Sequence, residues 1–344
     1  MAVHFQNLTR TQEIGANSYL LDDGRSRILL DSGMHPKGKG FDALPDFSLL
    51  GQALLDAVII THAHLDHIGS LPVLMRRQPE VRAVMTPLTA EITETMLHNS
   101  CNVMTAQRDQ DGIVEYPLFT HREIDNSLRR WRHQRPGRRF ELGRTGVDCE
   151  FFDAGHLPGS VGVRLDYPNL RVFYTGDVHF EPQTLSTAAS FPDEPADVLI
   201  MECTRGATPR PPDYSRQRES WRFAEAIMRT IGRGGSVLVP VFALGKTQEI
   251  LIMIHDLKRT GHLATGIPIH IGGLSTRMTQ IIDRHSNDVP RTHPGFRILD
   301  NMAGLVKTKK GERLTTAAPG RIYALSSGMM SEYTVSNDLS LIHI

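Results

Sequence analysis

The stretch VIITHAHLDHIG, residues 58–69, decides how the rest of the chain is interpreted. An apolar, β-branched run typical of a buried strand leads directly into His62, His64, Asp66 and His67. Imidazole and carboxylate groups are the usual protein ligands of zinc, iron and nickel. A single histidine after a strand is usually structural. Four potential ligands at the exit of one strand instead predict a metal site that the sheet holds open to substrate.

Further ligands must lie elsewhere in the chain, because one cluster cannot complete a site for two metals. FFDAGHLPGS, residues 151–160, presents His156, and VFYTGDVHF, residues 172–180, presents Asp177. Both residues lie where a predicted strand passes into a loop. Alone, each would be an ordinary loop residue, but together with the first cluster they complete a pattern.

Four segments, in this order, resemble the motifs of the metallo-β-lactamase fold. They are ILLDSG (28–33), HAHLDH (62–67), AGHLPGS (154–160) and YTGDV (174–178). The resemblance covers roughly Gly15 to Glu202 and implies an αββα sandwich with metals at one edge.

The same resemblance implies two Zn²⁺ ions and a role for each matching residue. The first metal would be held by His62, His64 and His156, the second by Asp66 and His67, and Asp177 would bridge them. Asp31 would orient one of these ligands from behind. The carboxylates would also accept iron or manganese.

The sequence after residue 200 is similar to the β-CASP branch of this fold. These nucleases include the endonuclease subunit of the pre-mRNA cleavage and polyadenylation machinery and its prokaryotic relatives. The similar segments are MECT (201–204), GRGGSVLVPVFALGKTQEIL (232–251) and LSSGMM (325–330). Glu202 matches the acidic residue of the first extra motif of the branch. Strand–helix alternation also predicts a parallel α/β sheet here. We therefore expect a metallo-β-lactamase domain at 1–205 and an inserted β-CASP domain at 206–338.

The branch also has two later histidine motifs, which this sequence lacks. One histidine would help to protonate the leaving group and the other would bind the second metal. Residues 339–344, LSLIHI, resemble a translated sequencing-library adapter, so we expect them to be non-native. We also expect the first domain to lack its C-terminal return and the second metal site to be incomplete. His343 is not a substitute, because its context lacks the motif.

The expected function is endonucleolytic cleavage of RNA by in-line attack of a hydroxide bridging two metals. Catalytic roles would fall to Asp66, Asp177, Glu202 and Asp31, with Glu202 orienting the missing acid. The second domain would clamp single-stranded RNA. The sequence does not indicate the oligomeric state, and a homodimer is one alternative. Two alternatives remain. A thioester or lactone hydrolase would share the ligands but should lack residues 206–330. A silent RNA-binding or partner-binding subunit would usually have lost ligands.

Composition gives no sign of a nucleic-acid or membrane partner, because Lys+Arg and Asp+Glu both total 38. Any such partner must be argued from local patches. RRWRHQRPGRRF, residues 129–140, is the most basic segment, and we expect a solvated loop or helix face there. A surface that contacts phosphate is the alternative. Three dispersed cysteines, no apolar leader and no apolar run of membrane-spanning length predict a cytoplasmic location.

Local signals predict several elements directly. Two apolar runs flank Asp22–Gly24 and predict a hairpin. Helical patterns occupy 88–107, 215–231, with Ser215 as cap, and 246–259, ended by Gly261. The GKT at 245–247 does not predict a nucleotide-binding loop, because Pro240 stands where that motif needs glycine.

Overall fold

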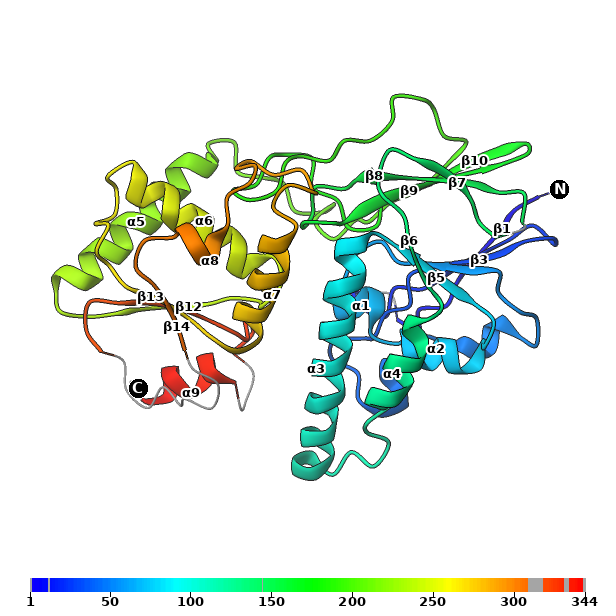
Figure 1. Cartoon of the computed structure of the whole chain (residues 1–344), viewed down its shortest axis with the longest axis horizontal. Coiled ribbons are helices and arrows are strands. Elements are labelled where there is room, and N and C mark those ends of the chain that lie inside the picture. The colour runs from blue at the N-terminus through cyan, green and yellow to red at the C-terminus, as the bar shows by residue number, and fades with distance from the viewer. Residues whose placement is uncertain (1, 12, 144, 309–317, 331–333, 343–344) are drawn as a thin grey trace. The chain divides into compact units, whose positions relative to one another are not determined.

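The structure is a computed structural model that describes residues 2–11, 13–143, 145–308, 318–330 and 334–342 (Figure 1). The chain divides into two compact units. Unit 1 comprises Met1–Glu181 and Ala188–Thr204, and unit 2 comprises Pro182–Thr187 and Arg205–Ile344. The short segment Pro182–Thr187 therefore belongs with unit 2, although the chain returns to unit 1 after it.

Unit 1 contains two sheets. The first has six strands in chain order: β1 (His4–Asn7), β2 (Tyr19–Asp22), β3 (Arg27–Leu30), β4 (Ala57–Ile59), β5 (Arg82–Met85) and β6 (Trp131–His133). The pairs from β3 to β6 are parallel, and the antiparallel pair β2–β3 confirms the predicted hairpin. The second sheet has the order β11-β10-β9-β8-β7. Its strands are β7 (Arg139–Glu141), β8 (Asp148–Asp153), β9 (Val161–Tyr167), β10 (Leu170–Tyr174) and β11 (Val198–Ile200).

The core of unit 1 lies between these sheets and uses every second residue of the strands. It includes Ile28 and Leu30 of β3 on one side and Val161, Val163 and Leu165 of β9 on the other. This spacing follows from the alternation of side chains across a strand. The intervening Leu29 is also fully buried, because helices cover the other face of the first sheet. A sheet covered on both faces explains why its strands are continuously apolar.

The helices of unit 1 are α1 (Leu65–Ile68), α2 (Leu71–Arg77), α3 (Pro87–Asp111) and α4 (His121–Leu128). Figure 1 shows α2, α3 and α4 on the side of the first sheet that faces away from the second sheet. The Thr86 side chain caps α3, and Gly112 ends it in the left-handed conformation at φ 69°. The mixed α/β architecture with two packed sheets agrees with the predicted fold class.

The basic segment is more ordered than predicted, since it contributes β6 and the start of β7. Trp131 is buried and pairs with Ala83 of β5, which makes this segment an edge of the first sheet. Arg130 donates hydrogen bonds to the carbonyl oxygens of Met75, Gln78 and Pro79, at and just beyond the end of α2. The prediction of a loop or helix face was therefore wrong for part of this segment.

Unit 2 is built around a four-stranded sheet in the order β12-β15-β13-β14, and all its strand pairs are parallel. This confirms the predicted parallel sheet. The strands are β12 (Val237–Pro240), β13 (Ile269–Ile271), β14 (Leu305–Lys307) and β15 (Ile322–Leu325). The helices are α5 (Arg216–Gly232), α6 (Lys246–Arg259), α7 (Gly273–Arg284), α8 (Ile298–Asn301) and α9 (Val335–Ile342). The Ser215 side chain caps α5 as predicted.

A buried carboxylate fixes the returning segment within unit 2. Glu249 of α6 accepts hydrogen bonds from the backbone N–H groups of Thr184, Leu185 and Ser186. The side chain of Lys246, which begins α6, lies 3.4 Å from the Gln183 amide oxygen. These contacts give the start of α6 a structural role.

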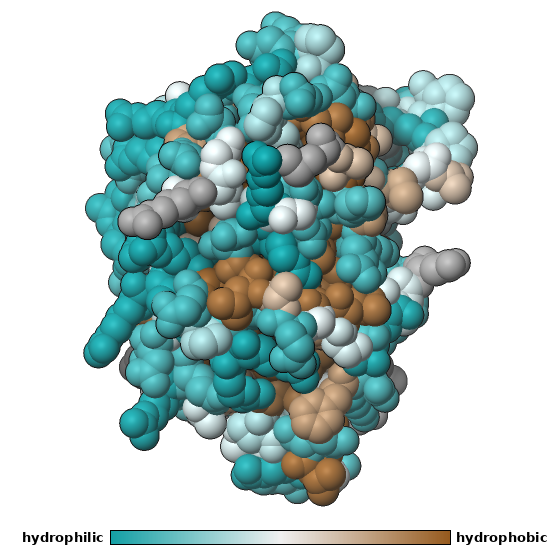
Figure 2. All heavy atoms as spheres, turned by 90° about the vertical axis from the view of Figure 1, so that its right-hand side faces the viewer, coloured by the Kyte–Doolittle hydropathy of each residue, from teal (hydrophilic) through white to brown (hydrophobic). Residues whose placement is uncertain are grey.

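Residue Leu339 of α9 is buried against Tyr323 and Leu325 of unit 2, and residues 343–344 of the expected non-native tail lie outside the described residues. Figure 2 shows the face of the molecule that lies on the right in Figure 1; hydrophilic side chains predominate there around a central group of apolar ones. No helix in the described part of the chain is both long and apolar enough to cross a membrane.

Candidate metal centre

All the site residues predicted from sequence lie at the same edge of unit 1. The pairings make β3 and β4 end at one edge of the first sheet, and β8, β10 and β11 end at one edge of the second. Asp31 follows β3, the cluster His62–His67 follows β4, and His156, Asp177 and Glu202 follow β8, β10 and β11. A hydrogen bond from Val161 N to Thr61 O, 3.0 Å long, joins the two sheets here.

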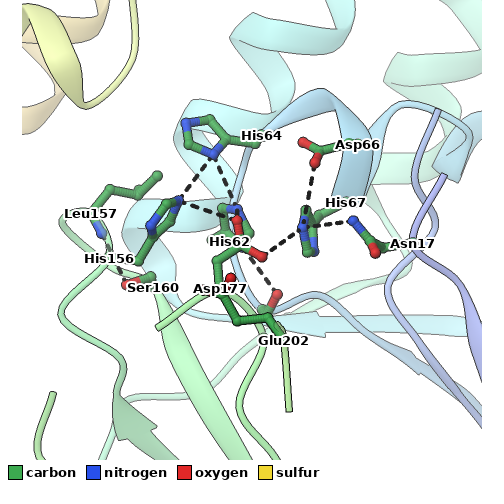
Figure 3. Close-up of polar contacts among 12 residues, drawn as sticks. Asn17, His62, His64, Asp66, His67, His156, Leu157, Ser160, Asp177 and Glu202 are labelled. Atoms are coloured by element: carbon green, nitrogen blue, oxygen red, sulfur yellow. Dashed lines mark hydrogen bonds and ion pairs between the residues drawn. The ribbon is translucent and has the colours of Figure 1, made fainter. Parts of the chain in front are cut away.

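Three imidazoles and one carboxylate converge on a common point (Figure 3). The chosen ligand atoms of His62, His64, His156 and Asp177 all lie within 4.8 Å of one another. His64 Nδ1 is 3.2 Å from both His62 Nε2 and His156 Nε2. Asp177 Oδ2 is 3.7 Å from His62 Nε2 and 3.5 Å from His156 Nε2. Tetrahedral zinc with bonds of about 2.05 Å separates its ligands by about 3.3 Å, so these residues fit a metal ion.

A second group of donor atoms shares the same carboxylate. His67 Nε2 lies 3.2 Å from Asp177 Oδ1 and 3.7 Å from Asp66 Oδ2. The two oxygens of Asp177 therefore face different groups of donor atoms. The Asn17 amide nitrogen also approaches His67 Nε2, at 2.9 Å. The described residues thus bring together all six ligands predicted from the sequence.

Asp31 fixes the orientation of His67. Its carboxylate is fully buried and its Oδ2 accepts hydrogen bonds from His67 Nδ1 and from the Tyr174 hydroxyl, both at 2.8 Å. Its Oδ1 accepts another from the backbone N–H of Thr61, at 2.8 Å. With the proton of His67 held on Nδ1, Nε2 keeps the lone pair that a metal requires. Asp31 thus contacts His67 on the side of the ring opposite Nε2.

The surroundings of the site shift the pKa values of its two buried histidines in opposite directions. Burial and the nearby His67 hold the pKa of His62 well below its usual value, so His62 is neutral, as a ligand must be. Burial alone would lower the pKa of His67, but the carboxylates of Asp31, Asp66 and Asp177 outweigh it and raise that pKa. Burial likewise opposes the ionised form of Asp177, yet the charge of His67 lowers the pKa of that carboxyl. In the metal-free protein these carboxylates therefore favour the charged form of His67, and a metal ion bound at Nε2 would take the place of the second ring proton.

Two glycines allow the loops of the site to approach closely. A Cβ on Gly33 would lie 1.7 Å from the Asp66 carbonyl oxygen, which is backbone and cannot rotate away. Gly176 has φ +53°, and a Cβ there would lie 2.8 Å from the Thr61 side chain. Both glycines therefore set the distance between the ligand loop after β4 and its neighbours.

The loops that carry His156 and Asp177 are held by polar contacts. The hydroxyls of Thr86 and Thr89, at the start of α3, each donate to the Gly159 carbonyl oxygen at 2.9 Å. Glu202 Oε1 accepts a hydrogen bond of 2.9 Å from the N–H of Val178, next to Asp177. In this structure Glu202 supports the loop that carries Asp177.

Sequence reasoning missed three residues that complete the site. Thr61 and Tyr174 hold Asp31, and both stand inside quoted motifs, so a search for donors beside a buried carboxylate could have found them. Asn17 contacts His67 from 50 positions away in the sequence. No local pattern around Asn17 indicates that contact.

Comparison with known proteins agrees with this geometry. The Metallo-beta-lactamase superfamily profile matches residues 12–227. The chain is 29% identical over 254 residues to "Endoribonuclease YSH1" of Eremothecium gossypii, covering 73% of this chain and 32% of that protein. It is 28% identical over 321 residues to "Probable RNase MJ4" of Methanocaldococcus jannaschii, covering 92% of this chain and 67% of that protein. It is also 28% identical to "Cleavage and polyadenylation specificity factor 73" of Drosophila melanogaster, covering 93% of this chain and 47% of that protein.

The chain spans about a third of the length of the YSH1 relatives that it matches. Among solved structures, it resembles a protein of unknown function from Enterococcus faecalis V583, with a TM-score of 0.54 and 13% identity. That likeness covers 98% of this chain and 79% of the other, and it supports the fold alone.

Proposed function

Because the chain belongs to the metallo-beta-lactamase superfamily, we propose that its metal centre hydrolyses phosphodiester bonds of RNA, cutting within the strand. The observation that carries this proposal is the convergence of donor atoms from His62, His64, His156 and Asp177 within 4.8 Å. Relatives named as endoribonucleases or RNases supply the substrate class. The activity of those longer relatives is brought to this chain as part of the proposal.

The proposed cofactors are two Zn²⁺ ions that share Asp177. His62, His64 and His156 would hold the first, and Asp66 and His67 would hold the second. Bound in this way, the ions would lower the pKa of water and offset negative charge on the phosphate. Iron or manganese would also suit a site that includes carboxylates.

The residues of the chain make this possible by position and protonation. His67 Nδ1 donates its proton to Asp31 at 2.8 Å. His67 Nε2 therefore faces Asp177 and is the ring nitrogen that would bind the metal. Glu202 holds the loop after β10 through the N–H of Val178. Asp66 and Asp177 supply the negative charge that neutralises the cations. We therefore assign ligand roles to Asp66 and Asp177 and positioning roles to Asp31 and Glu202.

The proposal extends to the rest of the chain. Unit 2, with its parallel sheet, is assigned as the β-CASP domain and unit 1 as the metallo-β-lactamase domain. The proposed substrate is single-stranded RNA, because a single strand can bend its backbone to bring one phosphate to the buried His62 and His67, which a stiff duplex resists. A cytoplasmic location and a homodimer are further parts of the proposal, tested by imaging a tagged chain and by sedimentation.

The test compares the zinc-loaded chain with a ligand variant on three substrates. These are a single-stranded RNA, a hairpin RNA and a thioester. We expect internal cuts in the single-stranded RNA, slower cutting of the hairpin stem, and loss of all cutting in His64→Ala. Turnover of the thioester alone would favour a small-molecule hydrolase. RNA binding without cleavage by a chain with two bound zinc ions would favour a silent subunit.

A further inference from the structure

At the turn between β6 and β7, the basic segment contains two arginines that the fold does not use. Arg130 binds backbone carbonyls beyond α2, and Arg139 pairs with Glu150 and Asp166 at 3.5 and 3.3 Å. Arg135 and Arg138 are exposed and make no ion pair or side-chain hydrogen bond with any residue that the structure describes. Their charge is therefore available to a ligand.

Nearby carboxylates do not neutralise these two arginines. Glu150 already pairs with Arg164 at 2.5 Å, and Asp166 pairs with Arg164 and Arg171 at 3.2 and 2.7 Å. The acidic groups beside this part of β8 and β9 are thus already shared among other arginines. An uncompensated pair of guanidinium groups is notable in a chain with equal numbers of basic and acidic residues.

The two arginines flank a tight turn. Arg135 and Arg138 are the first and last residues of the sequence RPGR, and Gly137 has φ 73°. Proline at the second position and a glycine with positive φ at the third favour a type II turn. Such a turn limits the backbone freedom lost when both side chains bind one ligand.

The turn lies at the same edge of unit 1 as the metal centre. The N–H of Gln134 bonds to the Met85 carbonyl oxygen, at the C-terminal end of β5. The N–H of Gly137 bonds to the carbonyl oxygen of Phe151 in β8, the strand that leads to His156. Because β4, β5 and β6 are parallel neighbours, the end of β6 lies about 10 Å across the sheet from the end of β4.

We propose that Arg135 and Arg138 form a phosphate-binding site for the RNA strand beside the cleaved bond. The proposal rests on the proposed function for its substrate. Arginine suits this role because its planar guanidinium binds phosphate oxygens in pairs and never loses its charge. The site contacts backbone phosphates and therefore increases affinity without selecting a sequence.

The test is equilibrium binding of a fluorescent single-stranded RNA with phosphorothioate linkages, which keep the charge and resist hydrolysis. The zinc-loaded full chain is compared with Arg135→Ala/Arg138→Ala between 50 and 200 mM salt. Each phosphate contact on a single strand contributes about 0.7 to the slope of log affinity against log salt. If two contacts are lost, the affinity of the double variant should fall about sevenfold less than that of the wild type between 50 and 200 mM salt. Arg82→Ala, at the other end of β5, is the matched control and should leave the slope unchanged.

Each outcome separates this site from the proposed function. A lower slope in the double variant only, with unchanged hydrolysis of a small phosphodiester lacking flanking nucleotides, supports the site. RNA binding with the same slope in both proteins overturns the site and leaves the proposed function standing. Failure of the wild type to bind RNA overturns the site as well. Failure of the wild type to cleave RNA that it binds through these arginines counts against the function alone.

Discussion

Replacing Asp31 with asparagine tests how the fold prepares the second metal site. Every described group bonded to this carboxylate can act as a donor: the N–H and hydroxyl of Thr61, Nδ1 of His67 and the hydroxyl of Tyr174. An asparagine amide offers one acceptor oxygen and one NH₂ donor, so it cannot satisfy this set. If the NH₂ faces His67, the proton of the imidazole must move to Nε2. That proton would then occupy the position needed by a metal.

The expected size of the effect follows from this loss. Partners that orient a metal ligand typically contribute 10-fold to 100-fold to metal affinity. We therefore expect Asp31→Asn to weaken the second zinc by about 1.4 to 2.8 kcal/mol while the first zinc, at His62, His64 and His156, binds as before. The buried Asp31–His67 pair is also broken, so the metal-free protein should lose about 3 kcal/mol of stability.

The assay is competition for zinc between the protein and a chromogenic chelator, with circular dichroism to verify folding. Tyr174→Phe is the matched control, because it removes a donor at 2.8 Å from the same oxygen but leaves the His67 contact intact. We expect it to change the second affinity less than threefold. Equal shifts in the two folded variants, or none in either, would refute the role assigned to Asp31.

Three further changes test other parts of the site. His64→Ala should abolish RNA cleavage and the first bound zinc without loss of folding; retained zinc at both sites would show that His64 is not a ligand. Gly33→Ala places a Cβ 1.7 Å from the Asp66 carbonyl, so we expect about 2 kcal/mol of destabilisation and less bound zinc; unchanged urea midpoint and zinc content would contradict this. Burial raises the pKa of Asp153 to about 6, so its contribution to stability is present below its unfolded pKa and is lost as pH rises through 6. In the metal-free chain, Asp153→Asn should remove this decline and be more stable by about 3 kcal/mol at pH 7.5; parallel stability curves for the two proteins would refute it.

The ligand positions could be predicted because each follows a recognisable strand. Runs such as VIIT before His62 and VFYT before Gly176–Asp177 indicate strands that end where polar residues begin. Once these strands run in the same direction, their ends must meet at one edge of the sandwich. Strand direction therefore explains why motifs far apart in the sequence lie together in a single site.

Other features depend on packing between distant parts of the chain. Asn17 reaches His67 only because its backbone also bonds to Asp66 and Gly33, and nothing near it in sequence indicates this. Trp221 lies within the predicted helix 215–231, yet it is 40% exposed and stacks on His262. Helical spacing identifies a face but does not determine how far across that face the neighbouring elements extend.

The sequence contains a signal that predicts the end of α3. The predicted helix stopped at residue 107, whereas α3 continues to Asp111 and ends at Gly112. Asp-Gly at 111–112 is a helix-ending signal, and here it marks the end of α3 better than the loss of apolar periodicity does.

We propose that zinc held around Asp177 cleaves RNA, and a cleavage assay of the zinc-loaded chain tests this proposal. The purified chain is loaded with zinc, its metal content is measured, and it is incubated with an end-labelled single-stranded RNA beside Asp177→Asn. We predict two zinc ions per chain and internal cleavage products that chelation removes and Asp177→Asn does not form. Intact RNA after incubation with a chain that carries both zinc ions would contradict the claim.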